Sequence, residues 1–273
     1  MRAEFWPELR NLTAFCKQSN VCTLALYFQV SDDYPVIVAA NRDEHFTRPS
    51  APPLLLATDP PIVGGKDLVS GGTWLGVNAD GLLVGVINRR PPKQQTALAD
   101  VRSRGLLCLD LLHLKDTAQC LTFLSAHKEE RYQPFTLLFC DRHSAYVSAN
   151  VSETIRSMQL TPGLHVFSNT MIHDERTEKM DRAYTLFAGL LNDKELPATP
   201  PDWILPLGKV LSDHSLGNRD EPREAICVHG ESSGTVSSSI IFYSARESRF
   251  RTFFCSGPPC QNSFSERLRV KVR

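Results

Sequence analysis

The sequence has no excess of charge of either sign and no long apolar run. Its 273 residues contain 30 Lys and Arg against 30 Asp and Glu, so the formal net charge is zero. Such a chain lacks the cationic surface typical of nucleic-acid-binding proteins, and we expect no nucleic-acid partner. No apolar run approaches the ~18 residues that a membrane-spanning helix needs, so we also expect no transmembrane segment.

Recognisable metal and cofactor motifs are missing too. The eight cysteines form no CxxC pair, and the eight histidines form no HExxH motif or regular ligand spacing. This pattern predicts no metal site, no cofactor, and reduced thiols rather than disulfides. Neither GxGxxG nor GxSxG occurs, and Gly64-Gly65-Lys66 lacks the glycine spacing of a phosphate-binding loop.

The first 21 residues lack the long apolar core of a secretory signal. Glu4 and Glu8 offset the basic residues there, which does not favour an organelle-transit peptide. We therefore predict a cytoplasmic protein, and we interpret residues 1–21 as a leader or as a mis-assigned start.

What the sequence does contain is a succession of short strand-like and helix-like segments. Residues 23–30 alternate apolar and polar side chains, residues 35–40 are continuously apolar, and the turn between them predicts a hairpin. Asp80-Gly81 predicts a second hairpin within residues 71–90. Further strands are expected at 136–140, 145–150, 165–169, 225–230, 235–244 and 249–255. Helices are expected at 102–113, 117–127, 174–193 and 204–214, and a proline-rich loop at 49–61.

This order, strands and helices in alternating blocks, fits two sheets covered by helices in a layered α+β sandwich. The sequence shows no internal repeat and no low-complexity linker, so we expect a single domain over residues 22–256. Residues 257–273 are polar and basic, and we expect a solvated tail there.

Four polar residues, Asn41-Arg42-Asp43-Glu44, follow the second apolar strand abruptly. A plain turn would more often contain Gly, Pro or Ser. Antiparallel strands bring their outer ends together, so this tetrapeptide is expected to lie beside Cys22, one strand upstream.

Five motifs in this order resemble the NRDE family, whose members are similar to transport and Golgi organisation protein 2. They are Ala40 to Glu44, Gly71 to Gly76 (GGTWLG), Asn88, Ser103-Arg104-Gly105 and Phe167-Ser168-Asn169. The resemblance covers about Cys22 to Ser244. It implies the four-layer αββα sandwich of N-terminal nucleophile hydrolases, which include bile-salt hydrolases and penicillin V acylases.

In those hydrolases the first residue of the mature chain is the nucleophile and its α-amine is the base. The resemblance therefore implies Cys22 as nucleophile. A free thiol, with a pKa of ~8.5, is only a few per cent thiolate at neutral pH. An α-amine with a pKa of ~7.7–8.0 can take the thiol proton, whereas a peptide nitrogen cannot.

The same resemblance brings Asn88 and Asn169 close to the two asparagines of bile-salt hydrolases, where side-chain amides can stabilise an oxyanion. Arg42 would lower the thiol pKa or hold a substrate carboxylate, and Asp43 would orient the ammonium group. The remaining candidates for substrate binding or orientation are Asn41, Glu44, Trp74 and Arg104.

Each candidate also has a structural interpretation. Cys22 is equally consistent with a small buried apolar residue, and Arg42 and Asp43 with a structural ion pair. Asn88 and Asn169 are consistent with turn positions, where asparagine is common. Trp74 equally fits a core residue. The chain also departs from some relatives at Gly234-Thr235-Val236, where those relatives have a late arginine.

Cys22 is not the first residue of this sequence, although the family normally places Cys directly after the initiator Met. Self-cleavage before Cys22 is one route to a free α-amine. The other, which we prefer, is translation from position 21, where a valine codon would be read as Met and then removed.

These features predict an NRDE-family hydrolase that cleaves a non-peptide C–N amide bond in a small-molecule substrate. The alternative from another class is a non-catalytic carrier or chaperone of haem or acyl-lipid ligands that uses the same pocket. A third interpretation is a scaffold with a relict site. The sequence makes no prediction about the oligomeric state.

Overall fold

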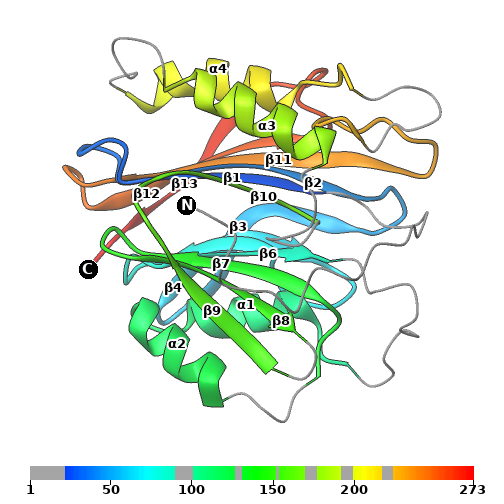
Figure 1. The fold of residues 1–273 in the computed structure, drawn as a ribbon. Helices are drawn as coiled ribbons and strands as arrows, with labels where there is room; N and C mark the ends of the chain where they lie inside the picture. The colour runs from blue at the N-terminus through cyan, green and yellow to red at the C-terminus, as the bar shows by residue number, and fades with distance from the viewer. Residues whose placement is uncertain are drawn as a thin grey trace.

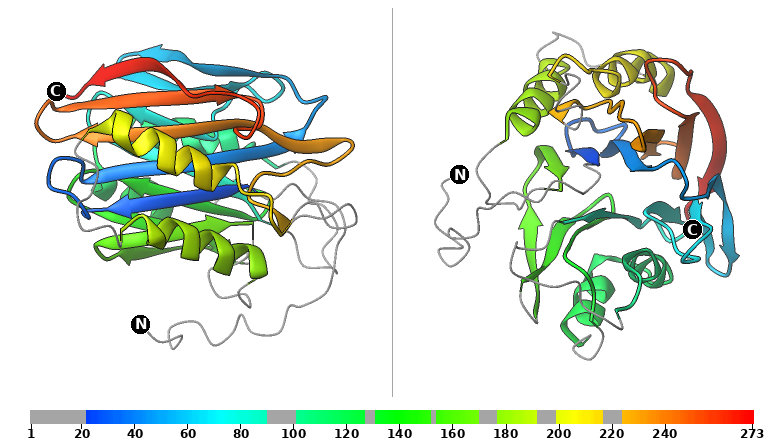
Figure 2. Two further views of the ribbon diagram at one scale, coloured as in Figure 1. Left: turned by 90° about the horizontal axis from the view of Figure 1, so that it is seen from above. Right: turned by 90° about the vertical axis from the view of Figure 1, so that its right-hand side faces the viewer.

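The computed structural model describes residues 22–89, 101–126, 131–151, 154–169, 177–191, 199–216 and 224–273. Two antiparallel sheets face each other, and each carries a pair of helices on its outer side (Figure 1). The two further views show the same order of helices, sheet, sheet, helices (Figure 2). The predicted α+β sandwich with four αββα layers is therefore confirmed.

One sheet has six strands and contains the motif-bearing strand near its centre. Its order is β10 (Gly163–Ser168), β1 (Thr23–Phe28), β2 (Val36–His45), β11 (Ser233–Ser244), β12 (Arg249–Ser256) and β13 (Ser265–Lys271). Its outer face is covered by α3 (Glu178–Gly189) and α4 (Pro200–Leu211).

The other sheet has seven strands in the order of the chain. They are β3 (Ser50–Thr58), β4 (Pro61–Asp67), β5 (Leu75–Asn78), β6 (Leu83–Asn88), β7 (Phe135–Cys140), β8 (Ala145–Val151) and β9 (Thr154–Leu160). Its outer face packs on α1 (Arg104–Leu112) and α2 (Thr117–Ala126).

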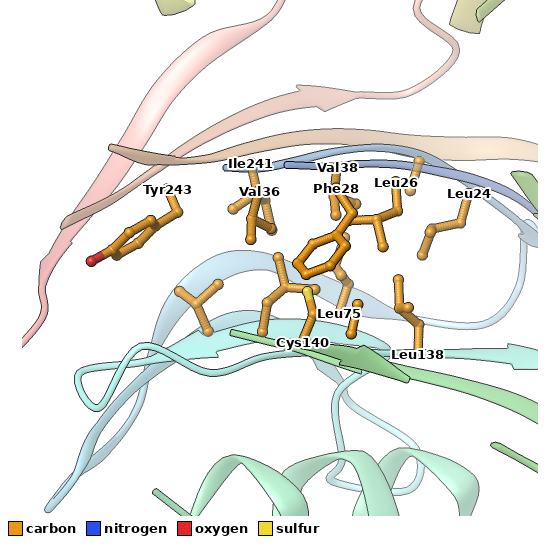
Figure 3. Close-up of a cluster of buried hydrophobic side chains, with 14 of the residues drawn as sticks. Leu24, Leu26, Phe28, Val36, Val38, Leu75, Leu138, Cys140, Ile241 and Tyr243 are labelled. Carbon is orange, nitrogen blue, oxygen red and sulfur yellow. The ribbon is translucent and has the colours of Figure 1, made fainter. Parts of the chain in front are cut away.

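Strand β1 shows how side chains alternate between two of the core layers. Leu24, Leu26 and Phe28 point between the sheets, where they meet apolar residues of the opposite sheet (Figure 3). Ala25 and Tyr27 point the other way, into the core under α3 and α4. The sequence predicted a half-buried strand, but both faces are covered and all six residues are buried.

Most expected hairpins and helices are present, and several segments differ from expectation, among them strand β4, which was not predicted. The proline-rich loop at 49–61 is mostly strand β3, an edge strand with two register irregularities, where Pro52 and Pro53 need not donate to a neighbour. Strand β9 was not predicted. Residues 225–230 form no regular strand, only an isolated bridge between His229 and Gly234. Helix α4 begins at Pro200, because proline is favoured in the first helical turn.

The C-terminal segment also differs from the expected solvated tail. Residues 265–271 form β13, which pairs with β12 and buries Val270 in the core between the sheets. The strand alternates exposed charged residues with inward-facing ones, and at the edge of a sheet this pattern looks polar in the sequence.

Candidate active site

The NRDE tetrapeptide lies within β2 and not after it. Thr23 pairs with Asn41 across β1 and β2, so Cys22 lies next to Arg42 and Asp43, as the sequence predicted. Strand alternation then divides the tetrapeptide between two layers. Arg42 and Glu44 face the space between the sheets, whereas Asn41 and Asp43 face the helices α3 and α4.

A cavity of about 400 Å³ opens between the two sheets at this point. Strands β1, β2 and β6 and the start of α1 contribute its walls. The sequence-predicted candidates that line it are Cys22, Asn41, Arg42, Asp43, Glu44, Trp74, Asn88 and Arg104. Asn169 is buried next to Ser168, the β10 partner of Thr23, but it is not among the lining residues.

The Cys22 thiol is half-buried at the edge of this cavity. Its Sγ donates to the backbone oxygen of Asp43 at 3.6 Å. Burial, and next the negative charge of Asp43, raise the pKa of Cys22 to about 12, although the positive charge of Arg42 acts in the opposite direction. In the continuous chain the thiol is therefore protonated at neutral pH and is a poor nucleophile.

Arg42 is held from three sides with 6% of its surface exposed. Its guanidinium carbon lies 4.6 Å from the centre of the Trp74 ring, and its Nη2 lies 3.6 Å from Glu44 Oε2 and 3.8 Å from Asp67 Oδ2. Within the described part of the chain, its buried Nη1 has no hydrogen-bond acceptor. Arg42 lines the cavity, and a guanidinium N–H without an acceptor is suited to bind an oxygen.

Asp43 is buried on the opposite face of β2. It accepts a hydrogen bond of 2.6 Å from Thr235 Oγ1, and its Oδ2 lies 3.8 Å from Lys179 Nζ of α3. Burial raises the pKa of Asp43 to about 6, while Lys179 and Thr235 act to lower it. Its carboxylate is thus ionised at neutral pH. It lies on the face of β2 that packs on α3, close to the Cys22 thiol.

Lys179 and Thr235 were not predicted as site residues. The buried residues of α3 are Lys179, Ala183 and Phe187, at a spacing of four residues. A lysine at an inward position of a helix was the available signal, because a buried amine needs an anionic partner. Thr235 was considered only as part of Gly234-Thr235-Val236, the segment in which this chain differs from some relatives.

Asn41 has a structural use for every hydrogen-bonding group of its side chain. Its Nδ2 donates to the backbone oxygens of Leu211 at 2.8 Å and Ile226 at 2.9 Å, and its Oδ1 accepts from Ser238 Oγ at 2.6 Å. The side chain therefore ties β2 to the end of α4 and to the segment before β11, and only the rest of the residue reaches the cavity.

The GGTWLG and SRG motifs pack directly on each other. A Cβ on Gly72 would lie 2.2 Å from the carbonyl carbon of Gly105, and the Thr73 N–H donates to the Gly105 oxygen at 3.0 Å. Ser103 caps the N-terminus of α1. The glycines thus allow two backbones to approach closely enough to place Trp74 and Arg104 on the cavity wall.

Arg104 and Asn88 complete the side of the cavity formed by the seven-stranded sheet and α1. Arg104 is the first residue of α1, and it donates to the Pro134 oxygen at 2.8 Å. Burial lowers the pKa of Arg104 to about 10, so the side chain remains cationic at neutral pH. Asn88 is the last residue of β6, where its side chain is exposed at the cavity.

Solved structures of similar fold define the class. A variant of the conjugated bile acid hydrolase from Clostridium perfringens covers 92% of this chain and 98% of its own, with a TM-score of 0.55 at 10% identity. The N-acylethanolamine-hydrolyzing acid amidase orthologue of Caenorhabditis elegans has a TM-score of 0.53 at 12% identity, covering 81% and 92%. The chain has the N-terminal nucleophile hydrolase fold.

Sequence comparison gives the family. The profile of the family described as Transport and Golgi organisation 2 matches residues 21–253. The mouse homologue of that name is 28% identical over 240 residues, which span 78% of this chain and 83% of the relative. The human homologue is 30% identical over 151 residues, 51% of this chain and 52% of the relative. The chain belongs to the Transport and Golgi organisation 2 family.

Among the residues that the structure describes, no helix combines the length and apolar character needed to cross a bilayer.

Proposed function

We propose that this protein hydrolyses a non-peptide C–N amide bond with Cys22 as the N-terminal nucleophile of its mature chain. One observation carries the proposal: the Cys22 thiol borders a cavity in which the buried Arg42 presents an N–H donor without an acceptor among the described residues. Similar structures are named for hydrolysis of conjugated bile acids and of N-acylethanolamines, which supports a small amide as substrate.

Release of the α-amine changes the chemistry of Cys22. While its nitrogen is in a peptide bond, no base is available there and the pKa of the thiol stays near 12. A free amine, with a pKa of ~7.7–8.0, is a base close to the sulfur. The match to the family begins at residue 21, directly before Cys22, and this supports a mature chain that starts at the cysteine.

The proposed reaction has two steps. The α-amine takes the thiol proton and the thiolate attacks the amide carbonyl carbon, forming an oxyanion that the side-chain amide of Asn88, which lines the cavity, stabilises. The C–N bond then breaks, the α-ammonium protonates the leaving amine, and a thioester remains on Cys22. Water, deprotonated by the α-amine, hydrolyses the thioester to a carboxylic acid. One oxyanion contact of this kind contributes ~2.7–4 kcal/mol.

The cavity walls indicate how a substrate would be held. Leu24, Leu75 and Trp74 offer an apolar surface for a substrate, and the Arg42 guanidinium, which packs on Trp74, is a donor for a substrate oxygen. A fixed guanidinium in a partly apolar cleft favours a carboxylate or carbonyl oxygen over a neutral alkyl group.

The test compares two chains that differ only at the start. One begins at Met1, and the other has Met directly before Cys22, so that removal of this Met exposes the amine. We expect a thiol-directed acylating probe to label Cys22 only in the second chain, and Cys22→Ser and Cys22→Ala to abolish labelling. The exposed Cys260 is an internal control, since peptide mapping separates it from Cys22.

Mass analysis of the N-terminus of protein isolated from its own cells tests the same premise directly. The proposal predicts a chain that begins at Cys22. A protein that keeps residues 1–21 and still hydrolyses its substrate would show that the mechanism is wrong.

One observation favours a second candidate, a carrier that uses the cavity without chemistry. While residues 1–21 remain attached to Cys22, its thiol is protonated at neutral pH and is a poor nucleophile, because its pKa is near 12. A carrier of haem or acyl-lipid ligands would show saturable binding that survives Cys22→Ala, with no turnover from either chain. Turnover that Cys22→Ala abolishes would exclude this candidate.

A further inference from the structure

Four cysteine and histidine side chains meet at the surface outside the cavity, near the C-terminal end of α4. They come from three separate parts of the chain: the residues just after α4, the segment before β11, and the loop between β12 and β13. The four residues are His214, Cys227, His229 and Cys260. None of them takes part in the proposed reaction.

The potential ligand atoms of these residues lie close together. The Sγ atoms of Cys227 and Cys260 are 3.7 Å apart, and His229 Nε2 lies 3.6 Å from the first and 3.2 Å from the second. Ligand atoms of His214, His229 and Cys260 all lie within 4.8 Å of one another. Cys227 Sγ lies beside two members of this group, His229 and Cys260.

The three separations among Cys227, Cys260 and His229 resemble edges of a zinc tetrahedron. Bond lengths of ~2.3 Å to sulfur and ~2.0–2.1 Å to nitrogen, at tetrahedral angles, place two sulfurs ~3.7–3.8 Å apart and a sulfur and a nitrogen ~3.5–3.6 Å apart. A disulfide would instead bring the sulfurs to ~2.05 Å. The 3.7 Å observed between Cys227 and Cys260 fits the zinc tetrahedron.

The histidines are also arranged as metal ligands. His214 Nδ1 lies 3.0 Å from the Ser212 oxygen, a contact that fixes the proton on Nδ1 and leaves Nε2 as the ligand atom. His229 directs Nε2 at both sulfurs. Cys227 and His229 are two residues apart in the chain, and Cys227 Sγ lies 3.6 Å from His229 Nε2.

We propose that His214, Cys227, His229 and Cys260 bind one zinc ion in a closed tetrahedral site. Four protein ligands leave no open position, so the ion has a structural role. It would join the end of α4, the segment before β11 and the β12–β13 loop.

Hydrogen bonds also connect this site to β2, the strand that contains Asn41 and Asp43. The Val228 N–H, between two of the ligands, donates to Thr235 Oγ1 at 2.9 Å, and Thr235 in turn donates to Asp43. The Ile226 oxygen, next to Cys227, accepts from Asn41. Zinc would therefore fix the segment before β11, which forms hydrogen bonds to Asn41 directly and to Asp43 through Thr235.

The experiment loads the full chain, produced without a polyhistidine tag, with Zn²⁺ or with Co²⁺ as a spectroscopic probe. After gel filtration we expect one metal ion per chain, and the Co²⁺ form should show tetrahedral d–d bands and a sulfur-to-cobalt charge-transfer band. Cys227→Ser and Cys260→Ser should each lose the metal ion on gel filtration and with it the charge-transfer band, and His229→Gln should weaken affinity at least ~10-fold.

Two variants serve as matched controls, the buried Cys255→Ala and the exposed His143→Gln, which lie outside the cluster and should bind metal like the wild type. A chelator should lower the melting temperature of the wild type but not of Cys260→Ser, which changes an exposed loop residue and keeps the fold. Equal metal uptake by wild type and Cys260→Ser would overturn the proposal. A Cys227–Cys260 disulfide in protein purified under reducing conditions would overturn it too.

Discussion

Arg42 and Asp43 are neighbours in the chain but act in different layers of the molecule. The guanidinium faces the cavity and packs on Trp74, whereas the carboxylate faces the helices and meets Lys179. Strand alternation separates them, so the structural ion pair weighed from the sequence does not form between these two residues. Each instead has its own partners, and Cys22 lies beside both.

Asp43 makes a testable contribution to the pH dependence of stability. Its folded-state pKa of about 6 lies above its ordinary value of 3.8, so the folded chain binds this proton more tightly than the unfolded chain. Its contribution is full below pH ~4 and is lost as the pH rises through ~6. At ~1.4 kcal/mol per pKa unit, wild type should lose roughly 2–3 kcal/mol relative to Asp43→Asn between pH 4 and pH 7.

Urea unfolding of both proteins across this range measures that difference. Thr235→Val provides a matched variant, because it removes the hydrogen bond that favours the charged carboxylate and should steepen the decline. Parallel stability curves for wild type and Asp43→Asn would contradict the assignment.

At the scale of elements, the motifs work through backbone contacts. Gly72 and Gly105 bring the loop before β5 against the first turn of α1, and Gly65 of β4 lies against the Trp74 ring. These contacts fix the wall of the cavity. Gly71, at φ +76°, supplies a tight turn, whereas Gly72 allows close packing.

Gly72→Ala should therefore destabilise the protein by roughly 2–3 kcal/mol, at the upper end of overpacking, because the obstacle is backbone and cannot move aside. Gly189→Ala is the control, since a Cβ there meets nothing within 4 Å. It should stabilise the last turn of α3 by ~0.4–1 kcal/mol. Chemical denaturation compares the two, and equal effects of the two changes would show that close packing at Gly72 is not required.

The elements predicted well were those with a strong local pattern. The Asp80-Gly81 turn and the alternating β1 each encode their structure within a few residues. Strand β3 was missed because prolines normally exclude a strand, and only its place at an edge removes that objection. Residues 225–230 look like a strand, but their polar groups are used by Asn41, Asp213 and Thr235.

At the scale of the whole molecule, the C-terminal strand helps to join the two sheets. Val270 of β13 is buried with Phe250 in the core between the sheets, and the Arg273 N–H donates to the Ala79 oxygen beyond β5 at 2.8 Å. The segment interpreted from the sequence as a solvated tail therefore contributes to the sandwich.

Val270→Ala should cost about 2–3 kcal/mol, because it removes buried methyl groups and leaves a cavity. Lys271→Ala, at the adjacent exposed position, should stay within ~0.5 kcal/mol of the wild type. Thermal unfolding of the two variants measures the contrast. A similar melting temperature for both would show that β13 does not contribute to the core.

The sequence by itself determined the sandwich, the pairing of β1 with β2 and the approach of Cys22 to Arg42 and Asp43. Period-two alternation and the register of a hairpin are local properties, readable over about 20 residues. The ordered motifs added the family and its fold.

Only the tertiary structure decided which groups face each other across long separations. Lys179 and Thr235 reach Asp43 from α3 and β11, and the four residues of the proposed zinc site come from three segments with no regular spacing. Closing such distances depends on how the layers stack, which no local pattern records. For the same reason the sequence predicted no metal site, whereas the folded chain brings His214, His229 and Cys260 together, with Cys227 beside the last two.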